Sequence, residues 1–156
     1  MNRILKTLPF LLLFALSLAF AQTSGEDFFN QNCAACHQAT GQGIPGAFPP
    51  LAGHVPDLLS AEGGHDYVVR VLLYGLQGPI TVNGKTYNGA MPAWGHLTDD
   101  QIAAVLGYVA TAWGNKEKLP EDFQAITAED VAGARGLNLT PQQVHELRSK
   151  VVTNEE

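Results

Sequence analysis

The segment Cys33-Ala34-Ala35-Cys36-His37 places two thiols and an imidazole where all three can bind one group. Two cysteines separated by two residues and followed directly by a histidine are typical of covalent attachment of a c-type haem. Each thiol can form a thioether with one vinyl group of the haem, and the adjacent imidazole can then bind the iron from one face. The motif therefore predicts one covalently bound haem c.

A second pattern, Gly41-Gln42-Gly43-Ile44-Pro45-Gly46, matches the G-x-G-x-x-G signature of a dinucleotide-binding turn. Such a turn needs a buried strand before it, a helix that opens within it, and an acidic residue on a second strand. Here a Cys-His segment precedes the glycines, and Pro45 interrupts them. We interpret the glycines as a flexible turn that lets the backbone pass close to a flat cofactor.

The two thiols have other possible uses. Cys33 and Cys36 are the only cysteines in the chain, so they could form a redox-active disulfide of the thioredoxin type. No strand-rich βαβ pattern surrounds them, and no second pair of ligands with zinc-site spacing follows them. Haem attachment remains the interpretation that we favour.

An electron carrier needs a second axial ligand on the iron. Apart from Met1, the chain contains a single methionine, Met91, which we place in a Gly- and Pro-flanked loop between a hairpin and the next helix. A thioether opposite His37 stabilises ferrous iron and raises the reduction potential. Four histidines are rival sixth ligands: His54, His65, His96 and His145. Of these, His54 and His96 are expected in loops and could reach the iron.

The N-terminus resembles an export signal. A basic start, the apolar run 8–21 and the small-x-small pattern Ala19-Phe20-Ala21 predict a secretory signal peptide over residues 1–21. The alternative is an uncleaved N-terminal anchor. In either case we expect the protein in the periplasm or on the outer face of the cytoplasmic membrane. The formal charge is −6, and removal of Arg3 and Lys6 makes it more negative, which argues against nucleic-acid binding.

The remaining patterns predict mostly helices around a small hairpin. A loop rich in Gly and Pro is expected over 38–56, and a hairpin over 80–87 turns at Asn83-Gly84 in a type I′ turn. Cap residues and apolar periodicity predict helices over 25–33, 56–61, 65–74, from the capping box at 98–101 to Gly114, and after Thr127 and Thr140.

Three segments carry a resemblance to class I (monohaem) cytochromes c: CAACH, FPPLAG at 48–53 and YNGAMPAW at 87–94. The resemblance covers roughly residues 24–114 and is strongest to soluble cytochromes c of thermophilic bacteria. It implies an all-α cytochrome c fold around one covalent haem, with a haem domain over 22–114 and a helical extension over 115–156 packed on this core. Gly25 and Phe29 are then expected to pack against Val105 and Tyr108.

The resemblance also assigns roles to the site residues. By it, Cys33 and Cys36 bind the haem covalently, and His37 and Met91 ligate the iron. The carbonyl of Pro49 would accept a hydrogen bond from the outer N–H of the His37 imidazole and fix the ring.

The implied function is that of a monomeric single-electron carrier rather than an enzyme, because both axial positions are filled. The similar thermophile proteins deliver electrons to a haem–copper terminal oxidase, and a quinol-oxidising complex or a dehydrogenase would be the donor. The alternatives are a cytochrome subunit of a dehydrogenase or reductase complex, and a haem enzyme with a labile sixth ligand. The lysine ring of mitochondrial members is absent, and no charged residue occurs in 38–56, 71–84 or 86–98, so we expect a charge-poor rim around the haem edge.

Overall fold

The computed structural model describes residues 24–151, so the predicted leader and residues 152–156 lie outside the described part. Among the described residues, helices make up about half, and the strands form two small two-stranded sheets. The elements are α1 (Gly25–Asn32), α2 (Ala34–His37), α3 (Val55–Ser60), α4 (Gly64–Tyr74), β1 (Leu76–Gln77), β2 (Ile80–Val82), β3 (Lys85–Tyr87), β4 (Ala90–Met91), α5 (Asp99–Thr111), the 3-10 helix η1 (Lys116–Lys118), α6 (Ala128–Arg135) and α7 (Pro141–Val151).

The predicted helix starts are confirmed by their caps. The Ser24 hydroxyl accepts from the Asp27 amide at the start of α1. At α5, Thr98 and Gln101 form a reciprocal capping box that satisfies two amides of the first turn. Thr127 makes the equivalent box with Asp130 at α6.

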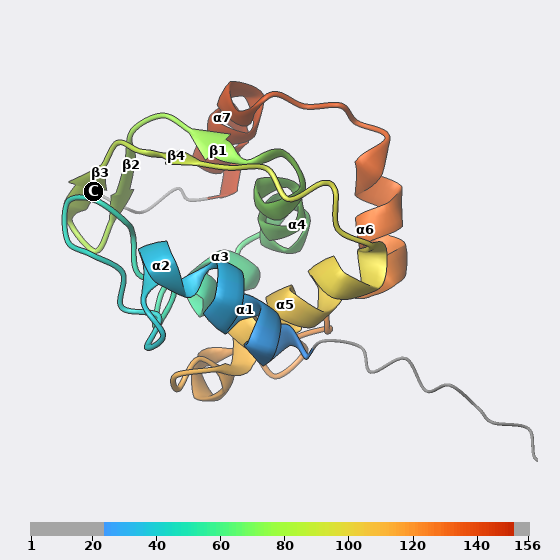
Figure 1. Cartoon of the computed structure of the whole chain (residues 1–156), viewed down its shortest axis with the longest axis horizontal. Coiled ribbons are helices and arrows are strands. Elements are labelled where there is room, and N and C mark those ends of the chain that lie inside the picture. Colours follow the sequence, from blue (N-terminus) through green and yellow to red (C-terminus); the bar gives the residue numbers. More distant parts are fainter. Residues whose placement is uncertain (1–23, 152–156) are drawn as a thin grey trace, which may run out of the picture.

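The first helix crosses the fifth at close range (Figure 1). A Cβ atom on Gly25 would lie only 2.0 Å from the Ala104 carbonyl oxygen, so only glycine permits this approach. Phe29 is fully buried, with ring centroids 5.5 Å from Tyr108 and 4.9 Å from Trp113. The predicted packing of Gly25 and Phe29 against Tyr108 is therefore confirmed.

The hairpin forms where the sequence indicates, but a second sheet was not predicted. β2 pairs with β3, and Asn83 and Gly84 both have positive φ, as a type I′ turn requires. β1 pairs with β4 in antiparallel register, with Leu76 opposite Met91. Met91 therefore lies in a short strand and not in an irregular loop, because β4 pairs with the strand β1 that follows α4.

The end of α5 also differs from the prediction. The helix stops at Thr111 rather than at Gly114, and Trp113 already has a positive φ of 54°. The Trp113 indole donates to the Ala39 carbonyl oxygen at 2.9 Å, a tertiary bond that draws the chain out of the helix. The short helix η1 then follows, which the sequence analysis missed.

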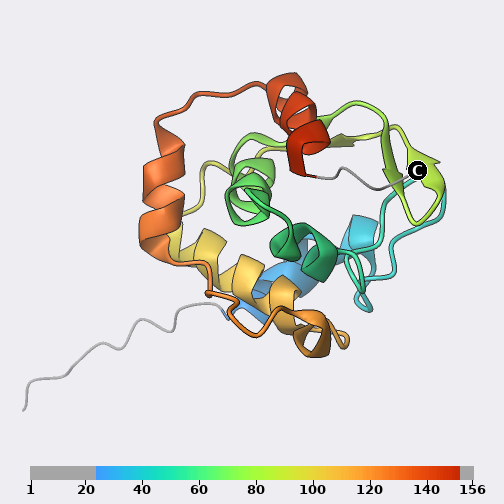
Figure 2. The same ribbon diagram turned by 180° about the vertical axis from the view of Figure 1, so that it is seen from behind.

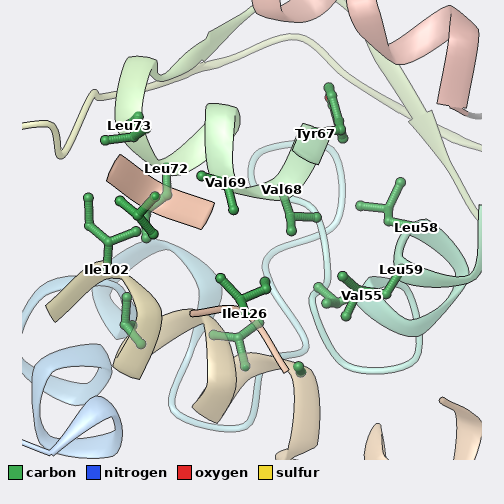
Figure 3. Packing of buried hydrophobic residues seen from close by; sticks show 14 of the residues in the cluster. Val55, Leu58, Leu59, Tyr67, Val68, Val69, Leu72, Leu73, Ile102 and Ile126 are labelled. Carbon is green, nitrogen blue, oxygen red and sulfur yellow. The ribbon is translucent and has the colours of Figure 1, made fainter. Parts of the chain in front are cut away.

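The C-terminal elements contribute to the same core as the rest of the described chain. α7 lies against α4 and β1, and α6 lies against α4 and α5, so both C-terminal helices cover α4 (Figures 1 and 2). Ile126 lies between α4 and α5, in the same buried cluster as Val69 and Ile102 (Figure 3). Val131 and Val144, from α6 and α7, are fully buried. Among residues 24–151, no helix has the length and apolar character needed to cross a membrane.

Candidate haem-binding site

Two adjoining hollows open between the N-terminal helices and the small sheets. They have empty volumes of about 720 and 820 Å³, open solvent included. Both are lined by Cys33, His37, Pro49 and Met91, and the first also by Cys36. The structure thus brings together all five residues singled out by the sequence.

On one wall, the end of α1 and the turn of α2 present the two thiols and the imidazole. Cys33 is the C-cap of α1 and the N-cap of α2, and His37 closes α2. The His37 Nδ1 donates to the Pro49 carbonyl oxygen at 3.0 Å. This bond leaves the Nε2 lone pair available for a metal ion. Burial lowers the pKa of His37 more than the Pro49 bond raises it, so the ring is neutral at pH 7.

The loop that carries Pro49 is fixed by its own backbone. The Gly41 carbonyl oxygen accepts from the amides of Leu51 and Ala52, at 2.7 and 2.9 Å. A Cβ atom on Gly43, at φ +65°, would lie 2.3 Å from the Phe48 carbonyl oxygen. No helix opens and no long strand lies between residues 38 and 53, so the glycine-rich stretch is a turn, as interpreted from the sequence. It is held by backbone hydrogen bonds and is not the flexible turn that we expected.

A buried side chain that the sequence did not single out also holds this loop. Asn115 is fully buried, and its Oδ1 accepts from the Gly53 amide at 2.7 Å. Its Nδ2 donates to the carbonyl oxygens of Leu51, at 3.3 Å, and Val109, at 2.8 Å. Asn115 therefore ties the loop beside Pro49 to the end of α5.

Another part of the lining is built around Met91 on β4. A Cβ atom on Gly75, at φ +79°, would lie 2.5 Å from the Met91 carbonyl oxygen, so the two chain segments touch through backbone. The Trp94 amide then donates to the Leu72 carbonyl oxygen at 2.9 Å. These contacts fix the backbone around Met91 against the end of α4.

Of the four rival histidines, His54 lines one of the hollows. It is buried, and Arg148 of α7 lies with its Nη2 3.4 Å from the His54 Nε2 and 3.1 Å from the Thr81 carbonyl oxygen. Burial first, and then the guanidinium charge, lower the pKa of His54 to about 4. Arg148 also lines this hollow, so its guanidinium places a positive charge on the wall of the hollow.

The other three histidines have contacts away from the hollows. His65 lies 3.9 Å from an Asp130 carboxylate oxygen, and His96 packs on the Trp94 ring with centroids 5.5 Å apart. The His145 Nε2 donates to the Pro79 carbonyl oxygen at 2.6 Å. None of the three lines either hollow, so the structure gives no support to them as ligands.

The thiols do not have the properties of a redox-active pair. Both cysteines are free, and burial, reinforced by the neighbouring Cys36, raises the pKa of Cys33 to about 11. A thioredoxin-type cysteine needs the opposite shift, toward the thiolate. In residues 24–151, no group of three or more His, Cys, Asp or Glu side chains could hold a metal ion alone, which disfavours a zinc site.

The comparison with known proteins agrees with this arrangement. Residues 22–113 match the Cytochrome c family (Cytochrom_C). The chain belongs to the cytochrome c family. It therefore binds a covalent haem c and transfers electrons, and the apolar hollow with thiols, imidazole and thioether on its walls fits that group.

Several proteins are similar to this cytochrome. Cytochrome c-552 of Thermus thermophilus is 54% identical over 134 residues, which cover 86% of this chain and 89% of that protein. The cytochrome c subunit of alcohol dehydrogenase (quinone) from Gluconacetobacter polyoxogenes is 34% identical over 116 residues, 74% of this chain but 23% of that subunit. The cbb3-type cytochrome c oxidase subunit CcoP of an Azospirillum species is 37% identical over 100 residues, 62% of this chain and 32% of that subunit.

Proposed function

We propose that this cytochrome is an exported single-electron carrier in which Cys33 and Cys36 tether the haem and His37 and Met91 bind its iron from opposite faces. The observation that carries the proposal is that these four side chains lie on the walls of one apolar site. The bound haem supplies reversible one-electron chemistry. The protein supplies the ligands, their orientation and an environment with little water.

Each residue has a distinct task in this proposal. Pro49 fixes the tautomer and the orientation of the His37 ring through the bond at Nδ1. The thioether of Met91 favours the ferrous form more than a second imidazole would, and so raises the reduction potential. Arg148 and the neutral His54 offer polar groups to the haem carboxylates at the otherwise apolar wall. With His37 and Met91 both bound to the iron, no position would remain for a substrate, so the protein would act as a carrier and not as a catalyst.

The proposed acceptor is a terminal cytochrome c oxidase, and the proposed donor is a quinol-oxidising complex or a dehydrogenase. The identity to cytochrome c-552, which extends over most of both chains, favours a free monomeric carrier. The similarity to an alcohol dehydrogenase subunit covers only 23% of that subunit, which favours the second candidate, a cytochrome subunit of a complex, less strongly. We place the carrier in the periplasm or on the outer face of the cytoplasmic membrane.

The ferric absorption spectrum of the holoprotein tests the ligand set. Thioether-ligated ferric haem has a weak far-red charge-transfer band, and we expect this band in the wild type. Met91→Ala should abolish the band, whereas His54→Phe should retain it, because His54 lines the site without binding the iron. A wild-type spectrum without the band, or its loss in His54→Phe alone, contradicts the proposal.

A further inference from the structure

We propose that Arg135, the last residue of α6, is a positioning residue that locks the segment carrying Met91 against the core. This inference rests on the proposed function, because it takes Met91 to be the sixth ligand. It assigns to the C-terminal part of the chain a control over how readily that ligand leaves the iron.

The guanidinium of Arg135 makes three contacts with one short segment. Its Nε donates to the Asp99 carboxylate, 2.5 Å away, at the first turn of α5. Its Nη1 donates to the Gly95 carbonyl oxygen at 2.6 Å, and its Nη2 donates to the Leu97 carbonyl oxygen. One planar side chain thus holds three positions from Gly95 to the first residue of α5.

The same segment also has apolar ties on its way from Met91, because Leu97 is buried in the core and the Trp94 ring packs against Phe28. β4 is only two residues long, and a pairing of this length cannot hold a strand in water by itself. The Trp94 amide donates to the Leu72 carbonyl oxygen, and Gly95 approaches the Leu73 carbonyl oxygen so closely that a Cβ atom would lie 2.9 Å from it. The segment is therefore anchored to α4 near Trp94 and to α6 through Arg135.

Arg135 is itself held on a fixed base. The Tyr74 hydroxyl lies 2.6 Å from the Ala134 carbonyl oxygen and 2.7 Å from that of Arg135. Hydrogen bonding from Tyr74 therefore fixes the end of α6 against α4. Val131, one turn earlier on α6, is fully buried in the core. The guanidinium is thus presented by a helix end that cannot swing away without breaking core contacts.

Arginine suits this position better than lysine. Its five N–H donors are held in a rigid plane, and here they reach a carboxylate and two carbonyl oxygens at once. A lysine ammonium is a single point charge and cannot span acceptors at three positions. Loss of these charge-assisted bonds should raise the population of open states of the segment, in which Met91 has left the iron.

The test measures how fast imidazole replaces the sixth ligand in the ferric holoprotein. Exchange requires Met91 to leave first, so the rate at saturating imidazole reports the opening of its segment. We expect Arg135→Ala to raise this rate about tenfold, with the far-red thioether band still present before imidazole is added. Arg135→Lys should give a smaller rise, and it carries the test alone if the alanine variant fails to accumulate.

Two control variants separate positioning from other effects. Arg70→Ala removes the same charge from α4, where Arg70 pairs with Asp66. Leu59→Ala removes buried apolar contact on α3, away from the Met91 segment, and lowers overall stability. Both should exchange imidazole within about twofold of the wild-type rate, whatever their melting temperatures.

The outcomes distinguish the inference from the proposal beneath it. A normal wild-type band with unchanged exchange in both Arg135 variants overturns the positioning role and leaves Met91 ligation intact. Equal acceleration in Leu59→Ala also overturns it, because general loosening would then explain the rate. Absence of the band in the wild type removes the ligand assignment and, with it, this inference.

Discussion

Replacement of Asn115 by alanine should destabilise the cytochrome more than any exposed polar substitution. The side chain is fully buried and makes three hydrogen bonds, to the Gly53 amide and to the carbonyl oxygens of Leu51 and Val109. At about 1 kcal/mol for each of the three bonds, the loss is about 3 kcal/mol. In a chain of this size that corresponds to roughly 10 °C in melting temperature.

The assay is urea unfolding of the holoprotein, with wild type and variants compared at one pH and one redox state. Gln124→Ala is the matched control, because this exposed amide donates only to the nearby Asp122 carbonyl oxygen. It should change the free energy of unfolding by less than about 0.5 kcal/mol. Asn115→Asp retains the acceptor but places a carboxylate beside two carbonyl oxygens, so its loss should exceed that of Asn115→Ala at pH 7 and diminish as the pH falls. A loss below about 1 kcal/mol for Asn115→Ala would refute the role assigned to this side chain.

Four further outcomes are expected. Gly75→Ala should lower both stability and the intensity of the far-red thioether band, because its Cβ would lie 2.5 Å from the Met91 carbonyl oxygen; an unchanged band contradicts this. Cys36→Ser should leave at most one thioether. We expect a lower yield of holoprotein and a shifted haem absorption spectrum, measured on the purified protein together with its mass. The bonds from Thr127 lower the pKa of Asp130 in the folded protein below its unfolded value near 3.8. The charged carboxylate therefore stabilises the fold fully above pH 3.8, and this contribution is lost as the pH falls through the lower folded pKa. In pH-dependent unfolding, Asp130→Asn should differ from wild type above these two pKa values and not below them. Electron transfer to the oxidase should change less than about tenfold between low and high salt, and a steep fall in rate would indicate a charged docking surface instead.

Local signals in the sequence predicted much of the fold and the residues that meet at the site. Each of the caps Ser24, Thr98 and Thr127 bonds to the amide three residues after it, so the sequence marks the helix starts directly. The hairpin turn at Asn83-Gly84 is likewise a property of two adjacent residues. The Cys-Ala-Ala-Cys-His motif identified one wall of the site because its chemistry depends on spacing within a single turn.

Features that depend on distant partners could not be predicted. The pairing of Leu76 with Met91 joins two strands of two residues each, too short to leave an alternating pattern. The early end of α5 depends on the bond from Trp113 to Ala39, 74 residues away in the sequence. Asn115 and Arg135 resemble ordinary polar residues until the fold brings their acceptors to them, so only the structure shows what they hold.

The packing of Phe29 between Tyr108 and Trp113 has a consequence for the order of events during synthesis. The chain is made from its N-terminus, and Trp113 comes more than 80 residues after Phe29. Until that distant stretch emerges, α1 has no surface to pack on, and an isolated helix of eight residues is not stable in water. The two thiols at its end therefore remain on an unpacked stretch of chain until the residues near Trp113 are available to cover it.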